Sequence, residues 1–143
     1  MTRNGITEAA IAPDVIKDYN LETFEISQAY PLFFDKLEKS NYFLESIIKT
    51  VDEDIQGRLV KHILANPLGD GGQWDMFVNL VNKYGVVPKY AMPEVKSSSA
   101  IREMDAYITK MLRFFAKDLR NAHKEGKSLE DLEAMKDKFN EDI

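Results

Sequence analysis

The sequence predicts a mainly α-helical protein. Apolar residues recur at helical spacing through most of the chain, glycine and proline separate the periodic segments, and helix-capping residues stand at the segment ends. With 143 residues and 44% hydrophobic content, the chain has the size of about one domain and can bury a core. Residues 1–20 carry weak periodicity and Pro13, so we expect a poorly determined lead-in there.

The first strong helical pattern covers residues 24–51. Ser27 can cap this helix, and Pro31 falls in or beside the first turn, where a missing amide hydrogen costs least. Its apolar positions are Leu37, Leu44, Ile47, Ile48 and Val51. A second helix is expected over 55–65, ended by Asn66-Pro67. Its core-facing stripe is Leu59, Val60, Ile63 and Leu64.

A glycine loop, Gly69-Asp70-Gly71-Gly72, precedes the third helix, and Gly85 stands where a left-handed C-terminal cap belongs. One face of this helix carries Trp74, Phe77, Val78, Val81 and Tyr84, and the other carries Asp75, Asn79, Asn82 and Lys83. For Trp74, core packing is the more frequent role of such a residue, and ligand contact is the alternative.

A long helix is expected from one of the caps Ser97, Ser98 or Ser99 to about Lys124, followed by Gly126. Its apolar positions are Ile101, Met104, Ile108, Met111, Leu112, Phe115 and Leu119. Ser128 and Asp131 resemble an N-terminal capping arrangement for a last helix that is still running at Ile143. That helix uses Leu129, Leu132, Met135 and Phe139.

Composition argues against several classes of function. The net charge of −5 and the lack of a basic run disfavour a nucleic-acid-binding protein. No apolar run is long enough for a membrane span, and the N-terminal residues lack a signal-peptide core, so we expect a cytoplasmic protein. Because the chain has no cysteine, disulfides and thiolate metal sites are excluded, and we expect no cofactor.

The titratable residues offer little chemistry of their own. His62 lies opposite the apolar stripe of its helix and is expected at the surface, whereas His123 near a helix C-terminus suits the helix dipole. Neither histidine has a nucleophile or a metal-ligand partner at a recognisable spacing, so we predict no catalytic residue and no metal site. The acidic run Asp52-Glu53-Asp54 is typical of a solvated face or of helix-start charge.

Two adjacent glycines let a backbone approach another backbone closely, so this loop could pair with an extended peptide. In isolation such a dipeptide is more often a tight turn between helices. Its neighbours favour the first interpretation. The strings DGGQWDM, NKYGVVPK and MPE, with FEISQAY and FFDKLEKSNYFLE upstream, resemble the bacterial aminopeptidase C and bleomycin hydrolase family of papain-like cysteine peptidases. The resemblance runs over residues 15–143.

The resemblance implies a fold and a site. Residues 21–143 would form the helical half of a papain-like cysteine peptidase, the left-hand domain, with part of a helical insertion from about 97 to 143. The loop Asp70-Gly71-Gly72-Gln73 would line the substrate cleft. Gly72 would hydrogen-bond the main chain of a peptide, Gly71 would shape the turn, and Asp70 and Gln73 would flank the subsite.

The family's catalytic glutamine, cysteine, histidine and asparagine have no counterparts in the sequence, and their segments are expected to be missing rather than mutated. We therefore expect a partial cysteine aminopeptidase that is inactive alone and binds peptide weakly at best. The alternative is a helical interaction module, or a pseudoenzyme, that associates with full-length family members.

The resemblance also generates a prediction about assembly. In the family, the helix that bears the cysteine packs centrally, so its loss should expose an apolar patch on its former neighbours. We expect marginal stability or self-association into a homo-oligomer. Light scattering and thermal unfolding over a range of protein concentrations check this expectation. A monomeric mass with a sharp, concentration-independent transition would contradict it.

Overall fold

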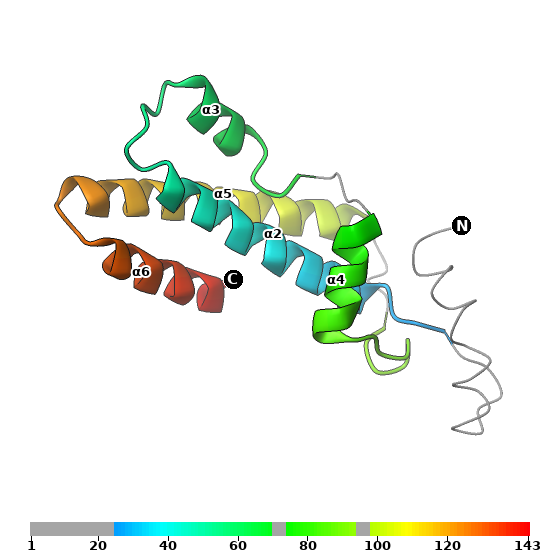
Figure 1. Ribbon diagram of the computed structural model, residues 1–143. Coiled ribbons are helices and arrows are strands. Elements are labelled where there is room, and N and C mark those ends of the chain that lie inside the picture. Colours follow the sequence, from blue (N-terminus) through cyan, green and yellow to red (C-terminus); the bar gives the residue numbers. More distant parts are fainter. Residues whose placement is uncertain (1–24, 70–73, 94–97) are drawn as a thin grey trace. The chain divides into compact units, whose positions relative to one another are not determined.

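The structure, a computed structural model, describes residues 25–69, 74–93 and 98–143 (Figure 1). It contains the helices α2 (Ala29–Lys49), α3 (Arg58–Ala65), α4 (Trp74–Tyr84), α5 (Ser98–Lys124) and α6 (Leu129–Asp142). The described residues contain no strand, and their one β-bridge joins Ile26 to Pro88. The mainly α-helical prediction is confirmed. No helix in the described part of the chain is both long and apolar enough to cross a membrane.

The chain divides into two compact units. Unit 1 holds Met1–Asp35 and Gly71–Lys96, and unit 2 holds Lys36–Asp70 and Ser97–Ile143. The start of α2 therefore belongs to unit 1 and the rest of α2 to unit 2. The predicted lead-in at 1–20 lies outside the described residues, and the domain bounds inferred from the sequence stay predictions.

Unit 2 has one hydrophobic core, formed by the second half of α2 and by α5, with α6 and the segment around α3 packed against them. Its central side chains, Leu44, Ile47, Leu112 and Leu119, are completely buried. Figure 1 shows α6 turning back along α5, and the Phe115 and Phe139 rings of these helices stack at 4.1 Å. The sequence periodicity thus identified the centre of this core correctly.

Two predicted helix ends in unit 2 are confirmed, whereas α3 begins at Arg58 rather than at residue 55 and α2 ends at Lys49 rather than at residue 51. Gly126 takes a φ of +88° after α5, as expected for a glycine that ends a helix. At the start of α6, Ser128 and Asp131 form a complete capping box, in which each side chain accepts a hydrogen bond from the other's backbone N–H. These caps satisfy backbone groups that a helix end otherwise leaves without partners.

Three apolar residues that were predicted to face the core are exposed. Leu59 is 53%, Met104 38% and Leu129 64% exposed. Leu59 lies about 100° around α3 from the buried Val60, and Met104 about 80° around α5 from the buried Leu112. Leu129 is on the same side of α6 as the buried Lys136, but it is the first residue of that helix. A spacing of one or three residues cannot by itself separate the middle of an apolar stripe from its edge.

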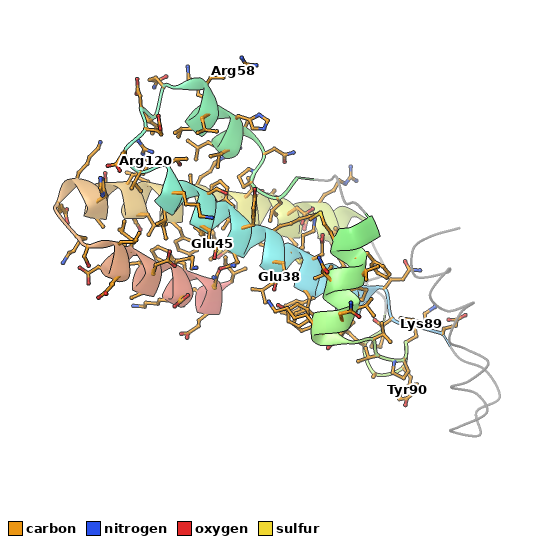
Figure 2. The ribbon with its side chains drawn as sticks, in the orientation of Figure 1. Glu38, Glu45, Arg58, Lys89, Tyr90 and Arg120 are labelled. Carbon is orange, nitrogen blue, oxygen red and sulfur yellow. The ribbon has the colours of Figure 1, made fainter. Side chains whose placement is uncertain are left out.

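Two arginines of α5 bind the carbonyl ends of other helices. Arg113 donates to the backbone oxygens of Leu64 and Ala65, the last residues of α3, at 3.2 and 3.3 Å. Arg120, buried beside the turn that follows α2, donates to the backbone oxygens of Thr50 and Glu53 (Figure 2). These carbonyls lie at or just after helix ends, so the arginines act as C-terminal caps supplied from elsewhere in the chain. The Thr50 carbonyl also accepts the N–H of Glu53, at 3.0 Å.

A buried lysine joins α6 to α2. The Lys136 ammonium lies 3.2 Å from a Glu45 carboxylate oxygen and 2.8 Å from one of Glu133, and its side chain is 9% exposed. The hydrogen bond to Glu133 raises the pKa of Lys136, outweighing the opposite effect of burial, and Glu45 adds to the rise. The charged form of Lys136 is therefore favoured in the folded state.

The ion pairs of Lys136 with Glu45 and Glu133 predict a loss of stability at alkaline pH. Since the folded-state pKa is raised above the ordinary value of 10.5, the contribution is complete below that value and disappears as pH rises through the folded-state pKa. We expect a difference in unfolding free energy between wild type and Lys136→Met of about 1 kcal/mol at pH 8. This difference should shrink as the pH rises above 10.5. Urea titrations from pH 8 to 11 measure it. The exposed Lys138→Met is the control, and a pH-independent difference for Lys136→Met would contradict the assignment.

Candidate functional site

The four residues of the predicted cleft loop, Asp70, Gly71, Gly72 and Gln73, lie outside the described residues. Before the loop, Leu68 is buried in the core of unit 2. After the loop, α4 belongs to unit 1 and buries Phe77 and Leu80. Phe77 was predicted to lie on the inward face, and Leu80 was missed. The side chain of Trp74 is also outside the described part, so its two interpretations stay open.

The end of α4 is fixed by the start of α2. The Tyr30 hydroxyl donates to the Tyr84 carbonyl at 2.7 Å, and the Phe34 ring stacks on the Tyr84 ring at 4.0 Å. Gly85 then takes a φ of +77° and donates its N–H to Val81 at 2.8 Å. This geometry confirms the predicted cap at Gly85. Glycine adopts this left-handed conformation without steric cost.

The chain after α4 pairs with the segment before α2 in a short antiparallel bridge. Ser27 donates its N–H to Val87, and Lys89 donates to Glu25, both at 2.9 Å. Between these bonds Pro88 stands opposite Ile26, at a position that needs no donor, so the missing N–H of proline costs nothing. Figure 2 shows Lys89 and Tyr90 in the turn that follows, where Tyr90 is 81% exposed.

Ser27 links the two segments of unit 1 a second time. Its completely buried hydroxyl accepts the N–H of Tyr30 at 3.2 Å, as predicted for a helix cap, and donates to the Met92 carbonyl at 2.6 Å. Pro31 lies in the first turn of α2, also as predicted. The sequence gave no signal for the bond to Met92, because its partner is a backbone oxygen 65 residues away.

The two histidines lie in unit 2, in different surroundings. His62 is exposed, as predicted, and lines an open cavity of about 360 Å³ with Ser46 and Thr50. Both hydroxyls donate to carbonyls of α2, Ser46 to Tyr42 at 2.8 Å and Thr50 to Ser46 at 2.7 Å. They are thus engaged as helix hydrogen bonds, and the cavity does not present an activated nucleophile.

His123 has a partner that the sequence did not reveal. Its Nε2 atom lies 2.8 Å from a carboxylate oxygen of Asp52, so part of the acidic run 52–54 contacts the end of α5. Within the described residues, no three His, Asp or Glu side chains gather as metal ligands would.

Comparison with known proteins identifies the family of this chain. The model of the Peptidase C1-like family matches residues 7–143. The chain belongs to this family. It is 49% identical over 129 residues to the aminopeptidase C of Streptococcus thermophilus, and 45% identical over 130 residues to the bleomycin hydrolase of Gallus gallus. Each match covers 90% of the chain and 29% of the relative, so the chain spans less than a third of the length of these peptidases.

A solved structure agrees with the family assignment. The crystal structure of PepW from Lactobacillus rhamnosis HN001 matches with a TM-score of 0.79 and 43% sequence identity, over 90% of this chain and 29% of PepW. The expected fold, a helical part of a papain-like peptidase, is therefore confirmed. The assignment of Asp70, Gly71, Gly72 and Gln73 to the substrate stays a prediction.

The hydrogen bonds of Ser27 predict that loss of its hydroxyl destabilises unit 1 more than loss of the Ser46 hydroxyl does. Ser27→Ala removes the cap of α2 and leaves the Met92 carbonyl without its donor, which should destabilise unit 1 by about 1–2 kcal/mol. Amide exchange at Lys89, bonded to Glu25, reports this loss locally. Ser46→Ala is the matched control, since its exposed hydroxyl bonds only within α2. Equal protection at Lys89 in both variants would refute the role of Ser27.

Proposed function

We propose that this chain forms part of the peptide-binding wall of a cysteine-type aminopeptidase of the aminopeptidase C and bleomycin hydrolase kind. The observation that carries the proposal is the high identity to proteins with these names over nine-tenths of the chain. Such identity over a family model spanning residues 7–143 supports a shared local fold and shared binding positions.

In this proposal, the Gly72 backbone hydrogen-bonds the main chain of a peptide. Gly71 shapes the turn, while Asp70 and Gln73 flank the subsite. The described neighbours support such a role indirectly, because α4 is a well-anchored element that begins directly after the loop. A binding loop mounted on a rigid element holds its backbone groups in place and loses less entropy when a ligand binds.

We further propose that the chain does not hydrolyse peptides alone. Catalysis in a cysteine peptidase needs a thiolate nucleophile, and these 143 residues contain no cysteine. The serine and threonine hydroxyls beside His62 are already donated to carbonyls of α2, so they offer no replacement. A cytoplasmic location and self-association remain predictions that accompany this proposal.

One experiment with two readouts tests the proposal. The purified chain is incubated with an amino-acyl arylamide, and arylamine release is followed with and without a thiol-alkylating inhibitor. We expect no inhibitable release. In parallel, isothermal titration calorimetry with trialanine should detect weak binding, and Gly72→Pro should reduce its affinity by about tenfold, as loss of one backbone N–H donor implies.

The matched control is Gly69→Ala. Among the described residues, a β-carbon at Gly69 would meet Asn66 alone, at an ordinary contact distance of 3.8 Å, so the variant should fold and bind trialanine like the wild type. Turnover that the inhibitor abolishes would overturn the inactive assignment. The proposed peptide-binding role would be wrong if trialanine did not bind, or if Gly72→Pro bound it as tightly as the wild type. If trialanine does not bind and the chain forms a stoichiometric complex with a full-length relative, the interaction module is the better description.

A further inference from the structure

One cavity of unit 2 has a wall of basic side chains. It lies between α5 and the segment around α3 and has a volume of about 220 Å³. In the ranges 25–69, 74–93 and 98–143, no carboxylate lines it. Its lining residues are Ile55, Leu64, Arg113, Ala116, Lys117, Arg120, Asn121 and Lys124. Because the four basic residues recur at intervals of three or four, they share one side of α5. This concentration of positive charge occurs in a chain whose net charge is −5.

Arg120, at the inner edge of this wall, is a buried cation that has no carboxylate partner among the described residues. It is 8% exposed, and its guanidinium donates to the neutral carbonyls of Thr50 and Glu53. Within the described residues it makes no ion pair. Guanidinium has five N–H donors, and two carbonyls leave several of them available. Since buried charges are normally paired, Arg120 is suited to an additional anionic partner.

The outer edge of the wall consists of two lysines that are still available. Lys117 and Lys124 are exposed, and neither makes a hydrogen bond or ion pair through its side chain in the part of the chain that the structure describes. They lie two turns apart on α5, roughly 10 Å along the helix axis. An anion placed between them would face Arg120, which lies between the two lysines in sequence.

The acidic residues near this wall are directed elsewhere or stand outside the cavity. Asp52 pairs with His123, and Glu53 offers its backbone oxygen to Arg120. Asp54 accepts the N–H of Gln56 at 2.9 Å. These carboxylates weaken the positive potential around the cavity, but they do not neutralise its lining residues by direct contact.

We propose that this cavity binds a small organic anion, a carboxylate or phosphate monoester carried on a short aliphatic body. The head group lies between Lys117, Arg120 and Lys124. The aliphatic body covers the apolar side formed by Ile55, Leu64 and Ala116. The volume favours a small ligand, because about 220 Å³ corresponds to roughly seven water molecules and is below the range of drug-sized pockets.

Titration of the ¹⁵N-labelled full chain with hexanoate and with hexyl phosphate tests the proposal, at constant ionic strength and with hexanol as the uncharged probe. The amides of Ala116, Lys117, Asn121 and Lys124 should shift and saturate with a dissociation constant on the order of 1 mM. The double variant Lys117→Gln/Lys124→Gln should bind at least about tenfold more weakly. The anion that binds more tightly identifies the head group.

The matched control is the double variant Lys61→Gln/Lys138→Gln, which changes the net charge equally at exposed positions outside the cavity lining. It should bind like the wild type. Three results would each overturn the proposal: no saturable shift with either anion, an equal response to hexanol, or the same loss of affinity in both double variants. The third result would mean that binding follows the net charge of the protein and not a specific site.

Discussion

The packing of α5 against the second half of α2 is the constraint on which the rest of unit 2 depends. Leu112 and Leu119 of α5 meet Leu44 and Ile47 of α2, and all four side chains are completely buried. The same helix supplies the donors for the carbonyls that follow α2, through Arg120, and for those that end α3, through Arg113. One element therefore both excludes water from the core and satisfies polar groups at two helix ends. This dual role explains why α3, which has only two turns, can hold its position beside α5.

Features that depend on local chemistry could be predicted from the sequence. The capping box at Ser128, the left-handed caps at Gly85 and Gly126, and the cap at Ser27 each involve residues a few positions apart. The arginine caps could not be predicted, because a backbone carbonyl 48 to 70 residues away leaves no mark in the sequence. The exposed Leu59 and Met104 show the second limit. Apolar periodicity gives the direction of a face, while its width depends on what packs against it.

The candidate cleft loop illustrates a different limit. The dipeptide Gly71-Gly72 is compatible with a simple turn, and only the surrounding strings assigned it to a substrate cleft. Family membership now rests on residues 7–143, yet it concerns the local fold and not the activity of a chain that spans 29% of its peptidase relatives. The structure adds the anchor of α4, namely the Tyr30, Phe34 and Tyr84 cluster. The spacing of Tyr30 and Phe34 by one helical turn was visible in the sequence, but their partner was not.

The choice between arginine and lysine along α5 follows from these contacts. Arg113 and Arg120 face backbone carbonyls, and a planar guanidinium can donate to two of them at once. Lys117 and Lys124 stand at the exposed rim, where a compact ammonium on a flexible stem stays hydrated until an anion arrives. Read as sequence, the four cations form a solvated helix face. In the fold, the two arginines cap carbonyls and the two lysines do not. The buried charge of Arg120 lies beside the same cavity as the two lysines, so one anion could interact with all three. Capping of carbonyls accounts for the position of both arginines, whereas it leaves the two lysines at the rim of the cavity unexplained.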